Sequence, residues 1–383
     1  MNVSVIGAGL MGSAISYDVL HETSIDTVTL IDNNHGALKQ AEKICKSDAL
    51  QTKKIDIKDE DKLKDACLGS FVIISAVPYF FNEMLTKIAI ENSAHFIDLG
   101  GNNDVVQRQK SLHDAAVDQQ VTIIPDSGLA PGLVSIITKD IVENYSDIEY
   151  VKLRVGGLPV NPKPPLEYEI VFSPNGLINE YLEDAIVLDH GKSIIKSSMS
   201  EIETISFPEP FENMEAFITS GGCSTLPTTY KNVINYLDYK TIRYPGHCEK
   251  FKTMLDLGFG STKSISVHGS KITPREVLIH QLEKKLPKTG NDVILLKVFA
   301  KARKNDDIIN IEYSMIDYID KKSNLSAMMR TTGFPVSITA DFLAKGIIKK
   351  PGVFCPEEII PTKMMFKELK KRNINIEKIE EKV

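Results

Sequence analysis

The glycine-rich stretch from Gly7 to Gly12, with the sequence GAGLMG, constrains the fold of this chain more than any other feature. It follows the apolar run from Asn2 to Ile6, which predicts a buried strand, and it leads into apolar residues at helical spacing. A glycine turn between a strand and a helix is the context in which the pattern G-x-G-x-x-G binds a dinucleotide. The alternative interpretation is a glycine turn that binds no ligand.

Each residue of the motif has a physical role in such a site. Gly7 permits the tight turn, Gly9 lets the backbone approach a pyrophosphate, and Gly12 lets the helix pack close to the strand. Leu10 and Met11 open the helix, whose free N–H groups and dipole attract the phosphates. We therefore expect these residues to bind a dinucleotide cofactor.

The next strand predicts which dinucleotide is bound. It spans Thr27 to Ile31 and leads into Asp32, about 20 residues beyond the glycines, as the fingerprint requires. A carboxylate here accepts hydrogen bonds from both ribose hydroxyls and repels a 2′-phosphate. The neighbouring Asn33 and Asn34 offer no cation for such a phosphate. The sequence therefore predicts NAD rather than NADP.

Strand and helix patterns alternate through the first third of the chain, which predicts an α/β fold with a doubly wound parallel sheet, the Rossmann fold. Its further strands are expected at residues 50–57, 71–75, 95–98 and 121–124. Ala76, Pro78 and Gly100 closely follow two of these strands. They are expected beside the cofactor, at the carboxyl edge of the sheet.

Longer runs of alternating apolar and polar residues predict a second, α+β domain with a mostly antiparallel sheet. Its strands are expected at residues 150–155, 168–172, 239–244, 293–302 and 308–318. We place the domains at residues 1–128, 129–330 and 331–383. Pro131 is expected to start a helix that runs to Glu143, and the charged segment from Lys370 to Val383 is expected to fray.

Composition argues against several classes of function. The chain has 383 residues, a formal net charge of −6 and no basic run, which argues against a nucleic-acid partner. Its most apolar stretch, Phe71 to Phe81, is too short to span a bilayer and contains Pro78, which argues against a membrane location. The five cysteines are scattered without metal-ligand spacing, so we expect no metal and a cytoplasmic protein with reduced thiols.

The richest polar cluster of the second domain runs from Asp238 to His247. Arg243 is one of only seven arginines and can clamp a carboxylate, although a structural salt bridge is the alternative. His247 can carry a proton or simply begin a helix. The segment from Thr219 to Pro227, which includes Thr225, can hold an anion or form an ordinary capped turn.

Several of these stretches together resemble the saccharopine dehydrogenase-like family, and within it the lysine 6-dehydrogenase branch. The similarity covers nearly the whole chain, up to about residue 333. Ser127 departs from the family pattern, in which alanine or cysteine is expected, and the segment from Pro164 to Tyr181 is similar to the lysine branch in particular. The other matching segments are residues 7–12, 74–78, 96–101, 126–132, 154–159, 217–227 and 239–247.

The resemblance implies NAD-dependent oxidation of the ε-amine of L-lysine, with release of ammonia and cyclisation of the product aldehyde to a piperideine carboxylate. An ε-ammonium group has a pKa of about 10.4 and must lose a proton before hydride can leave the adjacent carbon. Asp126 and His247 are the candidates at this cationic end, and Arg243 is the candidate for the α-carboxylate. Tyr79 and Thr225 are expected to line the pocket.

Two further cations bear on the choice of substrate. Lys240 could orient water or bind the carboxylate, although an exposed strand lysine is the more common case. Together with Arg154 and Arg243 it offers few cations for saccharopine, which has two more carboxylates than lysine. We therefore favour lysine as the substrate, with saccharopine dehydrogenation as the alternative within the family. An NAD-binding regulatory or scaffold protein is the alternative of another class.

The resemblance also implies C-terminal helices that pack back on the Rossmann domain, and a homodimer formed through the sheet of the second domain. A long alternating strand such as residues 308–318 would favour aggregation if its edge were free. Pairing between subunits is compatible with that pattern.

Overall fold

The computed structural model describes all 383 residues of the chain, which fold into two compact units. Unit 1 comprises residues 1–143, 320–325 and 329–375, and unit 2 comprises residues 144–319, 326–328 and 376–383. Our division at residues 128 and 330 is simpler than this arrangement. It does not anticipate that the last residues of the chain join unit 2.

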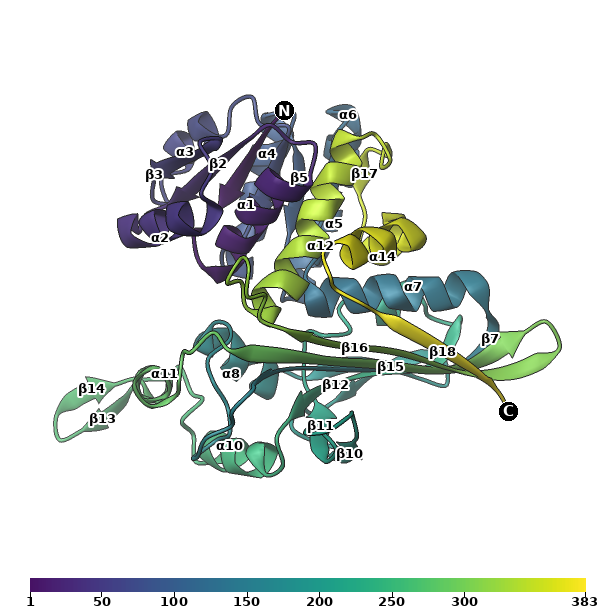
Figure 1. Ribbon diagram of the computed structural model, residues 1–383. Helices are drawn as coiled ribbons and strands as arrows, with labels where there is room; N and C mark the ends of the chain where they lie inside the picture. Colours follow the sequence, from purple (N-terminus) through teal and green to yellow (C-terminus); the bar gives the residue numbers. More distant parts are fainter. The chain divides into compact units, whose positions relative to one another are not determined.

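Unit 1 is built on a seven-stranded parallel sheet with the strand order β17-β6-β5-β4-β1-β2-β3 (Figure 1). Apart from the added edge strand β17, this is the order expected of a doubly wound dinucleotide-binding sheet. Its central strands are buried, as their continuous apolar runs predict, so the expected Rossmann fold is confirmed. The strands are β1 Asn2–Ile6, β2 Thr27–Asp32, β3 Leu50–Lys54, β4 Val72–Ser75, β5 His95–Asp98, β6 Thr122–Ile124 and β17 Gly352–Val353.

Among the helices of unit 1, the one expected to begin at Pro131 begins later than predicted. Residues 130–132 have non-helical backbone angles, and Gly132 has a φ of 123°, so the expected helix begins at Val134 and not at Pro131. The helices are α1 Leu10–Glu22, α2 His35–Cys45, α3 Glu60–Ala66, α4 Asn82–Glu91, α5 Asn103–Lys110, α6 His113–Asp118, α7 Val134–Asn144, α12 Ala327–Ala344, α13 Pro356–Ile359 and α14 Thr362–Lys371.

Unit 2 is built on a nine-stranded sheet in which only the β12–β7 pair is parallel. The strand order is β10-β11-β12-β7-β15-β16-β18, and β8 and β9 branch from β12. The long strands β15 and β16 pair antiparallel and lie side by side in Figure 1. The expected mostly antiparallel sheet is therefore confirmed. The strands are β7 Ser146–Pro159, β8 Ala185–Asp189, β9 Lys192–Lys196, β10 Glu203–Ile205, β11 Met214–Ile218, β12 Ile234–Arg243, β15 Asp292–Lys304, β16 Asp307–Tyr318 and β18 Glu377–Lys382.

One expected strand of unit 2 is wrong. Residues 168–172 form an irregular segment, in which Tyr168 and Val171 are buried in an apolar cluster with three helices. Their spacing therefore reflects packing against helices and not pairing within a sheet. These helices are α8 Pro174–Leu182, α10 His247–Asp256 and α11 Pro274–Lys285; the unit also contains α9 Leu226–Thr229 and the small hairpin β13 Ile265–Val267 with β14 Ser270–Ile272.

The charged C-terminal segment is a strand, so the expectation that it frays is wrong. β18 pairs antiparallel with β16, and every residue of β18 is exposed. Glu380 accepts a hydrogen bond from the hydroxyl of Tyr145 (2.6 Å) and pairs with Lys304 (2.7 Å). Backbone pairing with a long neighbour thus orders a segment that buries no apolar side chain, and it covers the edge of β16.

Candidate functional site

The glycine motif forms a cradle at the start of α1. A Cβ atom on Gly12 would lie 1.7 Å from the carbonyl oxygen of Gly7, and one on Gly7, whose φ is 103°, would lie 2.7 Å from that of Ala76. Both positions therefore need glycine for the turn and for the close approach of α1. A Cβ on Gly9 would meet nothing within 4 Å, so the backbone there faces open space. An open backbone at a helix N-terminus fits a pyrophosphate group.

Asp32 is held rigidly at the end of β2. Its Oδ2 accepts a hydrogen bond from the backbone N–H of Ala8 (2.7 Å), and its Oδ1 accepts one from the backbone N–H of Asn34 (2.7 Å). The neighbouring Asn33 is exposed. These bonds fix a negative charge beside the glycine turn, where the adenosine ribose of a dinucleotide is bound in this fold.

The other predicted cofactor residues lie at the same edge of the sheet. Ala76 follows β4, and its N–H donates to the carbonyl at the end of β1 (2.8 Å). Pro78 precedes a short helical turn that begins at Tyr79. A Cβ on Gly101 would lie 3.1 Å from the Tyr79 ring, so the turn at Gly100 and Gly101 packs against it. The structure thus places Tyr79 with the predicted cofactor residues of unit 1.

Asp98, to which our sequence reasoning assigns no role, organises this edge. It is fully buried at the end of β5, and its Oδ1 accepts hydrogen bonds from the backbone N–H groups of Gly100 (2.8 Å) and Asp126 (3.1 Å). Burial raises the pKa of the Asp98 carboxyl, and hydrogen bonds from Gln109 and these two N–H groups oppose the rise. Asp126 is 1% exposed with a φ of 59°, so Asp98 orients the loop that carries the predicted catalytic carboxylate.

In unit 2, Arg243 lies at the end of β12 among aromatic side chains. We define the Arg243 cluster as Tyr168, Tyr181, Arg243 and His247. Arg243 is 3% exposed; its Nε donates to the Tyr181 hydroxyl (2.8 Å), and its Cζ lies 5.0 Å from the centre of the Tyr168 ring. Its Nη1 donates to the carbonyl of Ile242 (2.9 Å), and no acidic side chain forms an ion pair with it. Arg243 therefore keeps donor capacity for a carboxylate ligand.

His247 is the neutral end of a hydrogen-bond chain. Its Nδ1 lies 2.9 Å from the carbonyl oxygen of Leu166, and because a carbonyl only accepts, Nδ1 carries the proton. Its Nε2 then accepts from the Tyr181 hydroxyl (3.1 Å). Burial, and next the charge of Arg243, lower the pKa of His247 to about 3. This geometry fits a residue that orients Tyr181 better than one that carries a proton at neutral pH.

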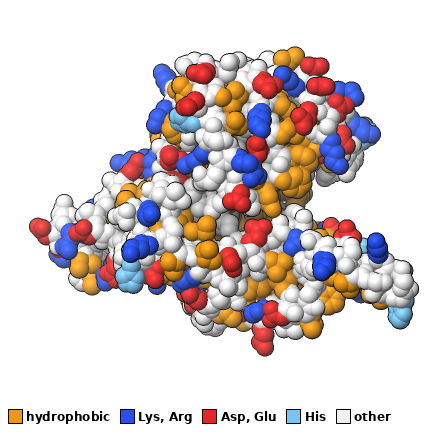
Figure 2. Space-filling model, turned by 180° about the vertical axis from the view of Figure 1, so that it is seen from behind, with side chains coloured by type: hydrophobic (Ala, Val, Ile, Leu, Met, Phe, Trp, Pro, Cys, Tyr) orange, Lys and Arg blue, Asp and Glu red, His pale blue; other side chains and the backbone are white.

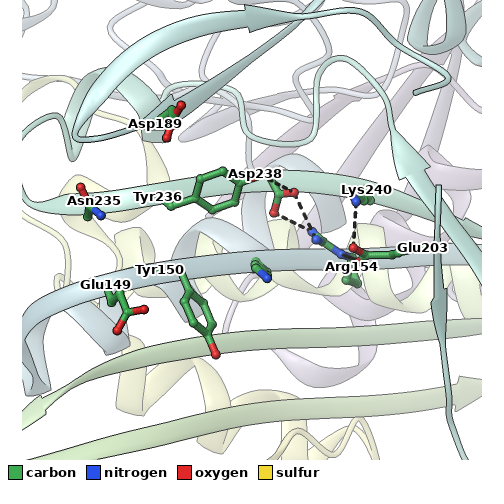
Figure 3. Close-up of a pocket in the computed structure, with 10 residues that line it drawn as sticks. Glu149, Tyr150, Arg154, Asp189, Glu203, Asn235, Tyr236, Asp238 and Lys240 are labelled. Atoms are coloured by element: carbon green, nitrogen blue, oxygen red, sulfur yellow. Dashed lines mark hydrogen bonds and ion pairs between the residues drawn. The ribbon is translucent and has the colours of Figure 1, made fainter. Parts of the chain in front are cut away.

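Lys240 and Arg154 lie on the other face of the sheet from Arg243. Successive residues of a strand point to opposite faces, and Lys240 of β12 pairs with Arg154 of β7. Arg154 donates to both carboxylate oxygens of Asp238 (2.8 and 3.1 Å) and also pairs with Glu203 (Figure 3). Lys240 pairs with the same Glu203 (2.8 Å). Both cations are thus neutralised by side chains of the protein.

These groups line an open hollow of about 440 Å³, which we call the Arg154 hollow. The hollow and the Arg243 cluster are separate places, so the structure does not bring Lys240 and Arg154 together with Arg243, in contrast to the single substrate pocket that we expected. The physical reason is the two-residue period of β12. The lining residues are Glu149, Tyr150, Lys152, Arg154, Asp189, Glu203, Asn235, Tyr236, Asp238 and Lys240.

Thr225 is the residue that precedes α9. It is 2% exposed at the start of α9, and its carbonyl accepts hydrogen bonds from two N–H groups of that helix (both 2.9 Å), as in an ordinary turn. Gly222 of the same segment packs on the ring of Tyr239, where a Cβ would lie 2.3 Å from the ring. Tyr239 and Arg243 share one face of β12 because they are four residues apart.

The tyrosines of the Arg243 cluster carry no signal in the sequence. Tyr168 comes from an irregular segment and Tyr181 from the end of α8, and both are far from Arg243 along the chain. Only the similarity of the segment from Pro164 to Tyr181 to the lysine branch could have directed attention to them.

The face drawn in Figure 2 carries both basic and acidic side chains. On the face in Figure 2, basic and acidic side chains are interspersed and form no single basic patch. The structure contains no helix that is both long and apolar enough to cross a bilayer.

Comparison with protein families matches both halves of the chain. Residues 3–124 match the saccharopine dehydrogenase NADP binding domain, and residues 128–374 match the saccharopine dehydrogenase C-terminal domain. This chain belongs to the saccharopine dehydrogenase family. It is therefore an oxidoreductase with a dinucleotide-binding domain, as the sequence-based resemblance implies at the level of the family.

Curated relatives of this saccharopine dehydrogenase family member share about a fifth of its residues. The saccharopine dehydrogenase [NADP(+), L-glutamate-forming] of Saccharomyces cerevisiae is 21% identical, with 96% of each chain covered. The mitochondrial alpha-aminoadipic semialdehyde synthase of Rattus norvegicus is also 21% identical. That match covers 92% of this chain and 45% of the synthase, so the chain spans less than half of that relative's length.

Solved structures support the same family fold. The apo saccharopine dehydrogenase (L-Glu forming) from Saccharomyces cerevisiae has a TM-score of 0.80 at 20% identity, with 99% of each chain covered. The homospermidine synthase from Legionella pneumophila, in complex with NAD, has a TM-score of 0.70 at 14% identity and covers 99% of this chain and 91% of that one. At these identities the likeness concerns the fold alone.

Proposed function

We propose that this protein oxidises the ε-amine of L-lysine with a nicotinamide dinucleotide. The observation that carries the proposal is Arg243, a buried guanidinium that has hydroxyl, carbonyl and aromatic neighbours but no carboxylate paired to it. A buried cation without a carboxylate in direct contact is disfavoured. The α-carboxylate of an amino acid supplies such a contact and suits the fork of an arginine.

The chemistry requires a proton acceptor and a hydride acceptor. The ε-ammonium loses a proton, the adjacent carbon gives a hydride to the nicotinamide, and the resulting imine adds water and releases ammonia. The aldehyde then condenses with the α-amine to form a ring and releases water. We propose Asp126 as the proton acceptor, because its backbone is held by Asp98 at the carboxyl edge of the sheet.

The remaining predicted residues have supporting roles in this proposal. Tyr79 would line the cofactor end of the pocket, and Thr225 would line the substrate end. His247 would hold Tyr181 in place for Arg243, because its Nε2 accepts the hydrogen bond from that hydroxyl. Lys240 and Arg154 would stabilise the sheet through the ion pairs of the Arg154 hollow.

We propose NAD as the cofactor. The name of the family's N-terminal domain and that of the yeast relative mention NADP, and the bound ligand of the homospermidine synthase is NAD. The fixed carboxylate of Asp32 and its exposed neighbour Asn33 favour NAD in this chain, because a 2′-phosphate would meet a negative charge and no cation. When bound, NAD would supply the hydride acceptor.

Saccharopine is the alternative substrate, and the names of the curated relatives favour it. It carries two more carboxylates than lysine, which would need two more cations. In unit 2 the candidates Arg154 and Lys240 are already paired with Asp238 and Glu203. This supply suits a substrate with one carboxylate.

A steady-state assay tests the choice. Purified protein is incubated with NAD and either L-lysine or L-saccharopine, NADH is followed by its absorbance, and released ammonia is measured. We expect NADH and ammonia in equal amounts with lysine, and kcat/KM at least ~100-fold lower with saccharopine. Efficient oxidation of saccharopine without activity on lysine would replace our proposal by saccharopine dehydrogenation. Activity on neither, with tight NAD binding, would favour a regulatory protein.

Two further expectations concern the protein in the cell. The five cysteines are all free and buried, which suits a reducing compartment such as the cytoplasm. The homodimer implied by the family resemblance stays a prediction, and sedimentation at several protein concentrations would test it.

A further inference from the structure

Gln109 of α5 is a buried residue to which neither the sequence patterns nor the family comparison gives a role. Its side-chain Nε2 donates hydrogen bonds to Oδ2 of Asp98 (2.7 Å) and to Oγ1 of Thr86 (3.0 Å), and all three residues are fully buried. The Oε1 atom of Gln109 is buried too, yet it has no hydrogen-bond partner. A buried acceptor without a partner is costly, so the orientation of this amide needs a physical explanation.

The two acceptors fix the orientation of the Gln109 amide. The Thr86 hydroxyl donates its single proton to the carbonyl oxygen of Asn82 (2.7 Å), so its own oxygen can only accept from Gln109. An ionised Asp98 can likewise only accept. Rotation of the amide by half a turn would satisfy neither group and would set Oε1 against a carboxylate oxygen. The amide therefore keeps its N–H groups on Asp98 and Thr86 and leaves Oε1 without a partner.

The carboxylate of Asp98, held in this way, anchors two loop segments at the carboxyl edge of the sheet. Its Oδ1 accepts hydrogen bonds from the N–H groups of Gly100 (2.8 Å) and Asp126 (3.1 Å). Asp126 has a φ of 59°, which is uncommon for a residue other than glycine. A Cβ on Gly100 would lie 2.0 Å from Oδ1 of Asp126, so the two segments touch. A shift of Asp98 would therefore move both of them.

We propose that Gln109 is a positioning residue for the reaction: it holds Asp98 in place, and through Asp98 it fixes the backbone of Asp126. The proposal rests on the proposed function in taking Asp126 as the proton acceptor. A base acts only within hydrogen-bond reach of the proton that it removes, so its backbone has to be fixed. This requirement explains an amide that spends both N–H groups on this network and leaves its own oxygen without a partner.

Gln109→Leu tests the proposal, because leucine fills a similar volume and donates no hydrogen bond. At saturating NAD we expect kcat for lysine to fall at least ~10-fold, since a displacement of a reacting group by about 1 Å can cost about 100-fold. KM for lysine should stay within about 3-fold of the wild-type value, because Arg243 binds the substrate in our proposal. A residue that only joins α5 to the sheet would lower the melting temperature without this change in kcat.

Two further variants serve as controls. Gln107→Leu makes the same substitution at an exposed position of the same helix, and its kcat should stay within about 2-fold of the wild-type value. Thr86→Val removes one acceptor of the amide but keeps the bond to Asp98, so kcat should fall only about 3-fold. If Gln109→Leu does not fold, judged by its thermal transition, Thr86→Val decides by the same measurements.

Hydrogen exchange provides a second readout, which does not depend on turnover. The N–H groups of Gly100 and Asp126 should exchange at least ~10-fold faster in Gln109→Leu than in the wild type, while those of β1 stay within about 2-fold. Faster exchange in a protein that does not oxidise lysine would refute the proposed function and sustain the anchoring by Gln109. Unchanged exchange would overturn the inference. Faster exchange with kcat for lysine unchanged would overturn it too, because the anchored loop would then play no part in the reaction.

Discussion

At the scale of single residues, the buried arginines Arg243 and Arg154 differ in the groups that they contact. Arg243 donates to a hydroxyl and a carbonyl, whereas Arg154 is paired with two carboxylates. Both arginines are almost fully buried, so burial alone does not separate the two roles. What separates them is the type of group that each arginine contacts.

A matched pair of variants tests this distinction. Arg243→Lys should lower kcat/KM for lysine about 100-fold with NAD affinity unchanged, because the bidentate contact to the substrate carboxylate is lost. Arg154→Lys should leave kcat/KM within about 3-fold of wild type but lower the free energy of unfolding by about 1–3 kcal/mol, because hydrogen bonds to Asp238 are lost. Steady-state kinetics and urea unfolding measure both. If both variants lost activity equally, we would conclude that Arg154 also acts in the substrate pocket.

Asp32 should decide the cofactor. We expect wild-type protein to prefer NAD over NADP in kcat/KM by at least ~10-fold, and Asp32→Ala to narrow the gap, because the charge that repels the 2′-phosphate is removed. Initial rates at varied NAD and NADP provide the ratio. Equal efficiency of the wild type with both cofactors would contradict the role of Asp32.

His247 should contribute to the pH dependence of stability. Its pKa is about 3 in the folded protein and near 6.5 in an unfolded chain, so between these pH values only the unfolded state binds the proton. The free energy of unfolding should therefore fall as the pH drops below about 6.5. His247→Asn, whose amide can still donate to Leu166, should show a shallower fall between pH 6.5 and 5 in urea titrations. Parallel curves for the two proteins would show that His247 is not buried in its neutral form.

At the scale of elements, the unit of β1, the glycine turn and α1 combines a packing requirement with a binding requirement. Gly12 serves packing, because a Cβ would collide with the backbone of Gly7. Gly9 has no such packing role, because its Cβ position is open and its φ of −70° is allowed for any residue, and we propose that it lets the backbone approach a pyrophosphate. Gly12 and Gly9 are therefore expected to have different physical roles, the first in packing and the second in binding.

Single alanine substitutions should separate these duties. Gly12→Ala should destabilise the protein by about 1–3 kcal/mol, because α1 must move away from the strand. The melting temperature of Gly9→Ala should lie within about 2 °C of the wild-type value, because the substitution introduces no strain. Its affinity for NAD should nevertheless be at least ~10-fold lower. Thermal melting and NAD titration give the two values. Destabilisation by Gly9→Ala equal to that by Gly12→Ala would contradict the assignment.

At the scale of the whole molecule, unit 1 is assembled from both ends of the chain. Arg372, just after α14, donates to both oxygens of Asp18 on α1 (2.8 and 2.9 Å) and to the carbonyl of Glu22 (3.0 Å). Asp18 also accepts from Ser337 of α12. This buried group joins the C-terminal helices to the first helix of the Rossmann sheet.

Loss of this contact should weaken the whole unit. Arg372→Met should lower the free energy of unfolding by about 3–5 kcal/mol, because Asp18 remains buried without its partner. The adjacent Lys371 is exposed and pairs with Glu368 at the surface, so Lys371→Met should change stability by less than about 1 kcal/mol. Urea unfolding compares the two. A loss for Arg372→Met no greater than that for Lys371→Met would mean that apolar packing alone joins the segments.

The sequence by itself determined the features whose contacts are local. The glycine turn, Asp32 and the positions after β4 and β5 are readable because each lies within one strand-turn-helix unit, where a residue's role follows from its neighbours along the chain. The Rossmann sheet follows from the same repetition of strand and helix. Lys240 and Arg243 are three residues apart on one strand. The two-residue period of a strand therefore also implies that their side chains point to opposite faces of the sheet.

Only the tertiary structure decided which charges are paired. Arg243 meets Tyr168 and Tyr181, and Tyr181 meets His247, because an irregular loop, a helix end and a strand end converge, and no periodicity encodes that convergence. The charged tail likewise became a strand because β16 offers an open edge to backbone N–H and C=O groups, which every sequence carries. A local sequence pattern indicates which face of a helix or strand is apolar. It does not indicate which distant segments lie beside that element in the folded chain.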